Sequence, residues 1–274
     1  MKILIAADME GITGVVHWNH VDPNHSEYTR FRRLMTGDVN AAIRGAFEGG
    51  ADEVVVTDGH AGGRNILIEE LDTRARLNAG TPSPLSMVQG VQEGVQGVMF
   101  LGYHACIGSQ NANLDHTWSD ERVVNLSING RSFGESGLNG AVCGHYGAPV
   151  ILISGDQTVC AEAADFFGPL EQAVVKTASG RFSAECLPPA VSWPKIQDAA
   201  RQAVSRLKAG QAPQPLRLPL PVSMVVDLVQ TEMADRASQL PGSRRTGGRR
   251  IEYTAPDMPT LYHAFLTLLA LARS

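Results

Sequence analysis

"KILIAADMEG", residues 2–11, indicates the fold class of this chain and raises its main chemical question. The stretch begins as a continuous apolar run, which is typical of a strand buried on both faces of a parallel sheet. It ends in two acids two positions apart, Asp8 and Glu10. Side chains at positions i and i+2 of an extended segment point to the same side, so both carboxylates would face one place. Such a strand end requires a positive partner, because neighbouring carboxylates otherwise repel each other.

Three further apolar runs resemble this first strand, and segments with helical spacing alternate with them along the chain. The segment 30–51 predicts a helix that stops at two glycines, and 136–146 predicts another. The alternating segment 122–130 predicts an edge strand or a hairpin arm. This order predicts a mostly parallel sheet between two helical layers, a three-layer α/β/α architecture. The further strands are expected at 52–60, 97–105 and 148–156.

The pattern of apolar and polar residues changes after about residue 180. A proline-containing connection is expected over 185–194, followed by a helix over 195–209, a strand over 222–229, a polar helix, a strand near 249–255 and a final helix over 258–272. We therefore expect two domains. The first, residues 1–180, is a metal-binding α/β catalytic domain, and the second, residues 181–274, is a smaller α+β subdomain.

The composition excludes several classes of partner and location. The 274 residues carry a net charge of −5 without a basic stripe, so we expect no nucleic-acid partner. No apolar run reaches the roughly 18 residues of a membrane span, and the N-terminus lacks the features of a secretory signal. The four cysteines are scattered without a CxxC pair, which indicates reduced thiols in a cytoplasmic protein.

Polar residues follow three of the expected strands where each strand ends. Asp8 and Glu10 follow the first, Asp58 and His60 the second, and His104 the third. Ligands of open α/β sheets bind outside the carboxyl ends of the strands, so these side chains should converge. Carboxylates and imidazoles are the ligand types of zinc and similar divalent ions. The number of acids fits a two-metal site, which could polarise a carbonyl and activate water near neutral pH.

Two further segments could contribute to this site. His116 lies in a loop rich in Asn, Asp and Thr, and Glu135 lies between glycines at the expected start of a helix. Spacing alone leaves both undecided, because His116 could be a surface residue and Glu135 could serve the helix dipole. Asp58 could orient His60 or cap the following turn. Other polar residues of the His116 loop could shape a pocket or hold the loop, namely Asn113, Asp115 and Thr117.

The order and spacing of five short motifs resemble those of the DppA-type D-aminopeptidases, zinc peptidases associated with dipeptide-transport operons. Each motif is weak alone, and together they span residues 8–140. They are "DMEG" (8–11), "TDGH" (57–60), "GYHA" (102–105), "LDHTWS" (114–119) and "FGESGLNG" (133–140).

This resemblance implies a metal-dependent aminopeptidase that hydrolyses the N-terminal peptide bond of short D-amino-acid-containing peptides, such as D-Ala-D-Ala. It implies two Zn²⁺ ions per subunit and a homodecamer of stacked rings that encloses a chamber. His116 falls at the motif position of the family's catalytic histidine. By motif position Asp8 bridges the two metals, and the other ligands are Glu10, His60, His104 and Glu135.

Two other functions stay open at this point. A different two-metal hydrolase, either an amidase or a phosphoesterase, could use the same ligands. The ligand motifs contain no Arg or Lys to clamp a phosphate, although Arg64 and Arg131 are near in sequence. A metal-stabilised assembly or peptide-binding protein is the non-enzymatic alternative, and it predicts a closed coordination shell with no open position.

Overall fold

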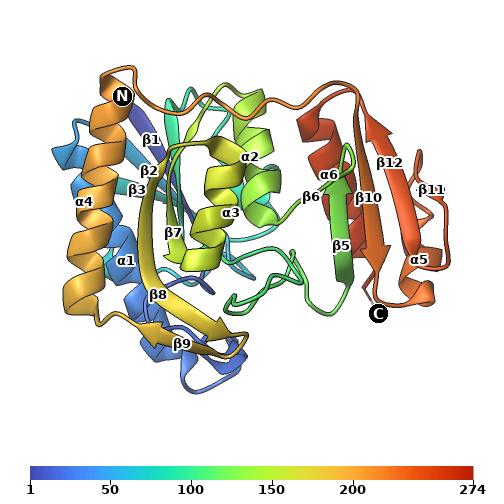
Figure 1. Ribbon diagram of the computed structural model, residues 1–274, viewed down its shortest axis with the longest axis horizontal. Coiled ribbons are helices and arrows are strands. Elements are labelled where there is room, and N and C mark those ends of the chain that lie inside the picture. The colour runs from blue at the N-terminus through green and yellow to red at the C-terminus, as the bar shows by residue number, and fades with distance from the viewer. Residues whose placement is uncertain (274) are drawn as a thin grey trace.

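The computed structural model describes residues 1–273 and contains two sheets, each accompanied by its own helices (Figure 1). Sheet A has seven strands and sheet B has five. The strands of sheet A, in chain order, are β1 (Lys2–Ala7), β2 (Glu53–Asp58), β3 (Ala75–Asn78), β4 (Gly97–Leu101), β7 (Val150–Asp156), β8 (Glu171–Gly180) and β9 (Ser183–Cys186).

Sheet A has the strand order β3-β2-β1-β4-β7-β8-β9, and its neighbouring strands are parallel except for the β8–β9 pair. Helices cover both faces, which confirms the expected three-layer α/β/α architecture (Figure 1). The alternation along β1 explains why, since Ile3 and Ile5 join the core on one face and Leu4 and Ala6 the core on the other. The covering helices are α1 (Tyr28–Glu48) and α4 (Pro189–Lys208) on one face, and α2 (Glu135–His145) and α3 (Gln157–Phe167) on the other.

The expected connection over 185–194 is wrong in its second half. Helix α4 begins at Pro189 and includes Pro194. Pro189 stands in the first turn, where a missing N–H leaves no helical bond unmade. Near the helix start, the Trp193 ring lies where a side chain on Gly37 would stand, and its indole donates to Asp38 on α1. These contacts hold the first turns of α4 in place.

Sheet B is antiparallel and packs against two helices, α5 (Thr231–Ala237) and α6 (Met258–Leu271). Its strands, in the order β11-β12-β10-β5-β6, are β11 (Arg244–Arg245), β12 (Arg250–Ala255), β10 (Val222–Leu228), β5 (Val123–Ile128) and β6 (Arg131–Ser132). β5 pairs with β6, so the segment 122–130 is a hairpin arm. β5 and β6 come from the first predicted domain but belong to sheet B, and α4 comes from the second but packs on α1. The division into 1–180 and 181–274 therefore stays a prediction.

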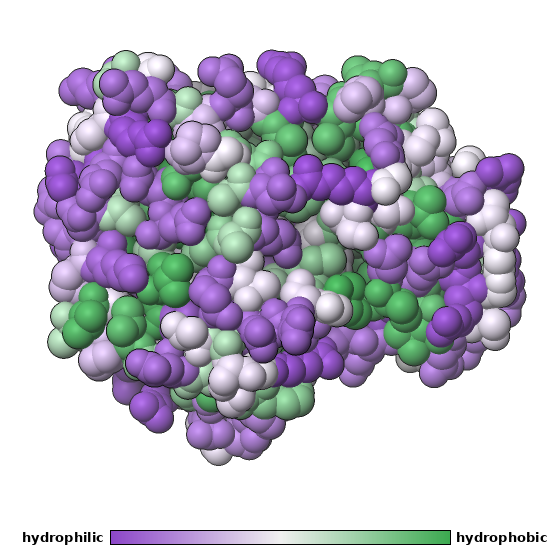
Figure 2. Space-filling view, in the orientation of Figure 1, coloured by the Kyte–Doolittle hydropathy of each residue, from purple (hydrophilic) through white to green (hydrophobic). Residues whose placement is uncertain are grey.

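Over residues 1–273, no helix has both the length and the apolar character needed to cross a bilayer. Figure 2 shows one face of the molecule, on which hydrophilic residues predominate and the hydrophobic ones form separate small groups. All four cysteines, Cys106, Cys143, Cys160 and Cys186, are free thiols.

The carboxyl ends of β2, β1 and β4 lie side by side and in register. Ala7 pairs with Asp58 on one side and with Leu101 on the other. The chain runs from β1 to β2 and β3 in one direction and then returns to the opposite side of β1 with β4. Open α/β sheets form a crevice at such a change of direction. The fold therefore places the three polar strand ends at one crevice.

Candidate metal centre and active site

The three strand ends bring two carboxylates and two imidazoles into direct contact. His60 Nδ1 lies 3.1 Å from Glu10 Oε2 and 3.5 Å from Asp8 Oδ1. The other oxygen of Asp8, Oδ2, lies 3.4 Å from His104 Nε2. Asp8 thus stands between the two histidines and turns one carboxylate oxygen to each.

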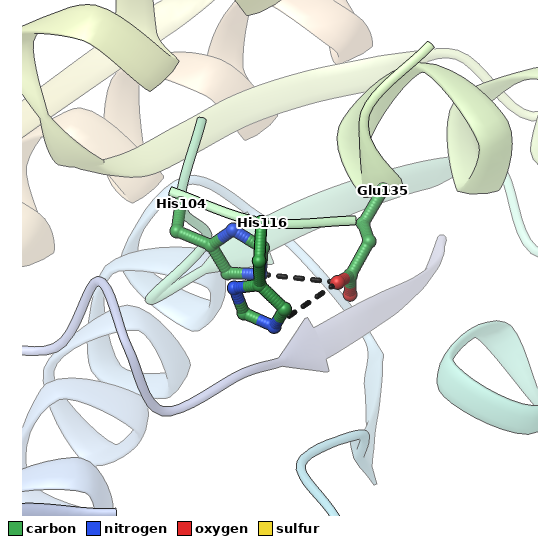
Figure 3. A group of neighbouring side chains, drawn as sticks. All are labelled: His104, His116 and Glu135. Carbon is green, nitrogen blue, oxygen red and sulfur yellow. Dashed lines mark ion pairs between the residues drawn. The ribbon is translucent and has the colours of Figure 1, made fainter. Parts of the chain in front are cut away.

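Glu135 and His116 complete the cluster, and both lie beside His104 (Figure 3). Glu135 Oε1 lies 3.1 Å from His104 Nε2 and 3.6 Å from His116 Nε2. The two imidazole rings stack with centroids 3.8 Å apart. Glu135 is the first residue of α2, where a helix favours negative charge, and Oε1 also accepts the backbone N–H of Trp118 at 2.7 Å. The six site residues that the family resemblance implies therefore lie at one site.

Two glycines allow the ends of β1 and β4 to approach each other. A side-chain carbon on Gly11 would stand only 1.9 Å from the carbonyl oxygen of Tyr103. Gly102 has a φ of +69°, and a carbon there would stand 2.3 Å from the carbonyl oxygen of Asp8. Glycine is required at both positions, because the backbones that carry Asp8 and His104 touch there.

Backbone carbonyls fix the orientation of all three histidines of the cluster. His60 Nε2 lies 2.9 Å from the carbonyl oxygen of Val21, His104 Nδ1 lies 3.2 Å from that of Ala105, and His116 Nδ1 lies 2.9 Å from that of Leu114. A carbonyl only accepts, so each of these nitrogens donates. The other ring nitrogen then faces the carboxylates with a lone pair in the neutral imidazole. Metal-binding histidines are oriented by outer hydrogen bonds of this kind.

The cluster has an excess of buried negative charge that needs a cation. Asp8, Glu10 and Glu135 are all buried, and Asp8 Oδ2 and His104 Nε2 have no hydrogen-bond partner among the described residues. Burial lowers the pKa of His104, but Glu135 and Asp8 outweigh it and raise that pKa well above its usual value. Burial likewise raises the pKa of Asp8, but His104 and His60 hold it well below its usual range. Within the protein, the positive charge near these carboxylates comes from protonated histidines and from the buried Lys176, which attracts Glu10.

The donor atoms fit divalent metal ions. Two groups of three residues each place a ligand atom within 4.8 Å of one another. His104 belongs to both groups, and His116 to one of them. The groups are Asp8, Glu10 and His104, and His104, His116 and Glu135. A metal ion would compensate the carboxylates and give the unpartnered atoms of Asp8 and His104 a bond, so the residues present fit the zinc that the motifs imply.

The residues left open by the sequence hold loops. The Asp58 carboxylate accepts the backbone N–H groups of Asn65 and Ile66 at 2.6 and 2.8 Å, so it caps the turn after β2. In the His116 loop, Asn113 bonds to Asp156, Asp115 bonds to Gly108, and Thr117 bonds to Ile107. None of Asn113, Asp115 and Thr117 lines the pocket beside the cluster.

That pocket has a volume of about 580 Å³, within the usual range for small-molecule sites. The carboxylate and histidine cluster forms one wall, and its other walls come from segments that gave no sequence signal. These are Trp18, the turn 81–87, Asp120 and Arg122, and the end of the chain from Leu266 on α6 to Arg273. Sequence reasoning missed them, because these segments are distant from one another along the chain and only the fold brings them together at the crevice.

Comparisons with known proteins agree with this geometry. The sequence model of the D-aminopeptidase family, peptidase family M55, matches residues 1–267. The D-aminopeptidase of Bacillus subtilis (strain 168) is 33% identical over 273 residues, covering 99% of this chain and 98% of that protein. The structure of the Zn-dependent D-aminopeptidase DppA from Bacillus subtilis, a self-compartmentalizing protease, is similar with a TM-score of 0.92 and 32% identity over 99% of this chain and 98% of that one. The chain belongs to the D-aminopeptidase family.

Proposed function

We propose that this protein is a zinc-dependent D-aminopeptidase that holds two zinc ions per subunit. In this proposal it hydrolyses the N-terminal peptide bond of short D-amino-acid-containing peptides such as D-Ala-D-Ala. One observation carries the proposal: in a cluster of three buried carboxylates, two atoms have no hydrogen-bond partner among the described residues, Asp8 Oδ2 and His104 Nε2. Such atoms are costly unless a ligand satisfies them.

In the proposed site Asp8 would serve both ions, because its two oxygens face different histidines. The remaining ligands are Glu10, His60, His104 and Glu135. Zinc held there supplies Lewis-acid chemistry, since it polarises a carbonyl and lowers the pKa of water. The three carboxylates exceed the charge of one ion, which supports two.

His116 is the proposed proton-transfer residue. Its Nδ1 donates to the carbonyl oxygen of Leu114, so Nε2 is an acceptor in the neutral ring. Nε2 lies 3.6 Å from Glu135, and His116 lines the pocket. The ring can therefore take a proton from the attacking water and return it to the leaving amine, while Glu135 stabilises the imidazolium. Its edge-on contact with Trp18, at 5.2 Å between centroids, restricts the ring.

The activity test uses zinc-loaded protein and three substrates, D-Ala-D-Ala, L-Ala-L-Ala and a phosphoester. We expect hydrolysis of the D,D-dipeptide alone. The phosphoester is included because Arg122 and Arg273 line the pocket and could clamp a phosphate. Hydrolysis of the phosphoester alone would reject the peptidase function and support the alternative two-metal hydrolase.

We further propose a homodecamer in the cytoplasm, as the family resemblance implies. The similar Bacillus subtilis protein is a self-compartmentalizing protease, which supports an assembly of several subunits here as well. Light scattering after size exclusion should give a mass about ten times that of the 29.3 kDa chain. A monomer or dimer at micromolar concentration would contradict the assembly and leave the chemistry of the site unchanged.

A further inference from the structure

The pocket has a positively charged end that the proposed chemistry does not use. Arg122 precedes β5, Arg273 follows α6, and both line the pocket that also contains the carboxylate and histidine cluster. Over residues 1–273, neither arginine forms an ion pair with a carboxylate. By contrast, Arg131, Arg244 and Arg250 at the surface each pair with an acid.

Arg122 is held in place by neutral acceptors. Its Nε donates to Ser119 Oγ at 3.0 Å, and its Nη1 donates to the carbonyl oxygen of Leu269 on α6 at 3.3 Å. Nη2 has no acceptor among the described residues. The side chain is half-buried, and burial together with the neighbouring Arg273 lowers the pKa of its guanidinium. A pre-oriented cation beside a second cation is an unfavourable arrangement that an anionic ligand would relieve.

The chain connects this cationic end closely to the reactive end. The segment between His116 and Arg122 folds into a tight turn, in which the carbonyl oxygen of Ser119 accepts the N–H groups of Arg122 and Val123 at 3.2 and 2.9 Å. At the start of the same segment, the Trp118 N–H bonds to Glu135. A dipeptide extends over about 7 Å, so a pocket of 580 Å³ can hold both ends of a very short peptide.

We propose that Arg122, assisted by Arg273, binds the free C-terminal carboxylate of the peptide substrate. This inference rests on the proposed aminopeptidase function and extends it to the class of substrate, which is a di- or tripeptide with an unblocked C-terminus. The α-amine end then lies toward the metal cluster. The residue after the scissile bond packs on the apolar side of α6, where Leu266 and Leu269 line the pocket. Asp120, which lines the pocket outside the cluster, is solvent-exposed.

The test compares two substrates that share the same scissile bond, D-Ala-D-Ala and its C-terminal amide. For the zinc-loaded protein, kcat/KM should be at least about tenfold higher for the free acid, since the charge-assisted contact with Arg122 is lost with the amide. The Arg122→Gln protein should lose at least that factor on the free acid and change less than about twofold on the amide. Arg273→Gln should show the same selective loss, with a smaller size, because Arg273 is exposed.

Arg131→Gln is the matched control, because it removes one positive charge from an exposed arginine outside the pocket. It should leave both substrates unchanged. A second readout is calorimetric binding of a reduced-amide analogue of D-Ala-D-Ala, with its C-terminal carboxylate either free or blocked. Arg122→Gln should lower the affinity of the protein for the free form only. Equal losses on acid and amide, or a wild-type protein indifferent to the carboxylate, would overturn the inference. Wild-type protein inactive on both peptides would instead contradict the proposed function and remove the basis of this inference.

Discussion

Buried carboxylates contact the segment that follows β1 at two places, the Asp8 cluster and the Asp38 cluster, and the two are built differently. Around Asp8, carboxylates and imidazoles leave two atoms without a hydrogen-bond partner among the described residues. Around Asp38, the buried carboxylate accepts the backbone N–H of Thr13 at 3.0 Å, the Thr13 hydroxyl at 3.1 Å and the Trp193 indole at 2.9 Å. Neutral donors thus satisfy Asp38, while the Asp8 cluster needs an added cation. The Asp38 cluster holds a loop, and the Asp8 cluster is suited to a ligand.

Lys176 connects the two clusters. This fully buried lysine on β8 donates to the carbonyl oxygens of Glu10 and Val15, the two ends of the intervening segment. Burial lowers the pKa of its ammonium to about 8. Lys176 therefore holds the segment that carries Glu10, which keeps the Glu10 carboxylate in the site.

Asp8→Ala should produce the largest effect. Loss of the proposed bridge should remove both zinc ions, and kcat/KM on D-Ala-D-Ala should fall by about a thousandfold or more, because the Lewis acid is lost. Metal analysis by mass spectrometry measures the zinc. Asp52→Ala, at an exposed acid outside the site, is the control and should retain both ions. Full zinc content in Asp8→Ala would show that the two clusters do not differ as described.

His116→Ala should come next. We expect kcat to fall by about 10²–10⁴, the usual contribution of a positioned acid or base, with both zinc ions retained. Steady-state kinetics and metal analysis on the same sample test this. Near-normal turnover with full zinc content would contradict the catalytic role of His116. Loss of zinc would make His116 a ligand, as its place beside His104 and Glu135 also allows.

Glu10→Ala should chiefly weaken one of the two metal sites. Glu10 contacts His60, which lies on the opposite side of Asp8 from His104. We expect zinc affinity at one site to fall by at least about 10–100-fold, because even residues that only hydrogen-bond to a metal ligand contribute this much. The other site should stay filled. Titration of zinc-free protein with zinc distinguishes the two sites. Simultaneous loss of both ions would contradict the separate roles of Asp8 and Glu10.

Asp38→Asn should have the smallest effect, and only on stability. Burial raises the pKa of Asp38 from 3.8 to about 6 despite the hydrogen bonds from Thr13 and Trp193. Between pH 4 and 6 the folded state then binds more protons than the unfolded state, so the free energy of unfolding falls as pH rises through this window. The contribution is at most about 3 kcal/mol.

Urea denaturation from pH 4 to 7 measures this effect as the difference between wild-type protein and Asp38→Asn. The stability of wild type relative to the variant should decrease up to about pH 6 and then level off. A difference that does not vary with pH would show that Asp38 ionises normally. The hydrogen bonds from Thr13 and Trp193 would then offset the whole cost of burying this carboxylate.

The strand-end part of this site could be predicted from the sequence, and the pocket could not. Continuous apolar runs mark β1, β2 and β4, and parallel strands must deliver their last residues to one edge, so Asp8, His60 and His104 had to lie near each other. The roles of these residues as metal ligands stay predictions. Glu135 and His116 required the family resemblance, because no periodicity places a loop beside a helix start.

Other features depend on tertiary contacts that no local pattern encodes. β8 and β9 were not expected, and α4 begins earlier than its prolines suggested, because packing on α1 overrides the local signal. The role of Asp58 as a turn cap depends on where Asn65 folds. Arg122 directly precedes β5, which pairs with β10 about a hundred residues further along the chain, so no local pattern places it at the crevice.

The metal content of the wild-type protein tests the central claim most directly. Protein purified without chelator and dialysed against zinc should contain two zinc ions per subunit, and X-ray diffraction at the zinc edge should place both between Asp8, His60, His104 and Glu135. D-Ala-D-Ala hydrolysis should disappear on chelation and return with zinc. No bound metal, or one ion away from these residues, would contradict the account.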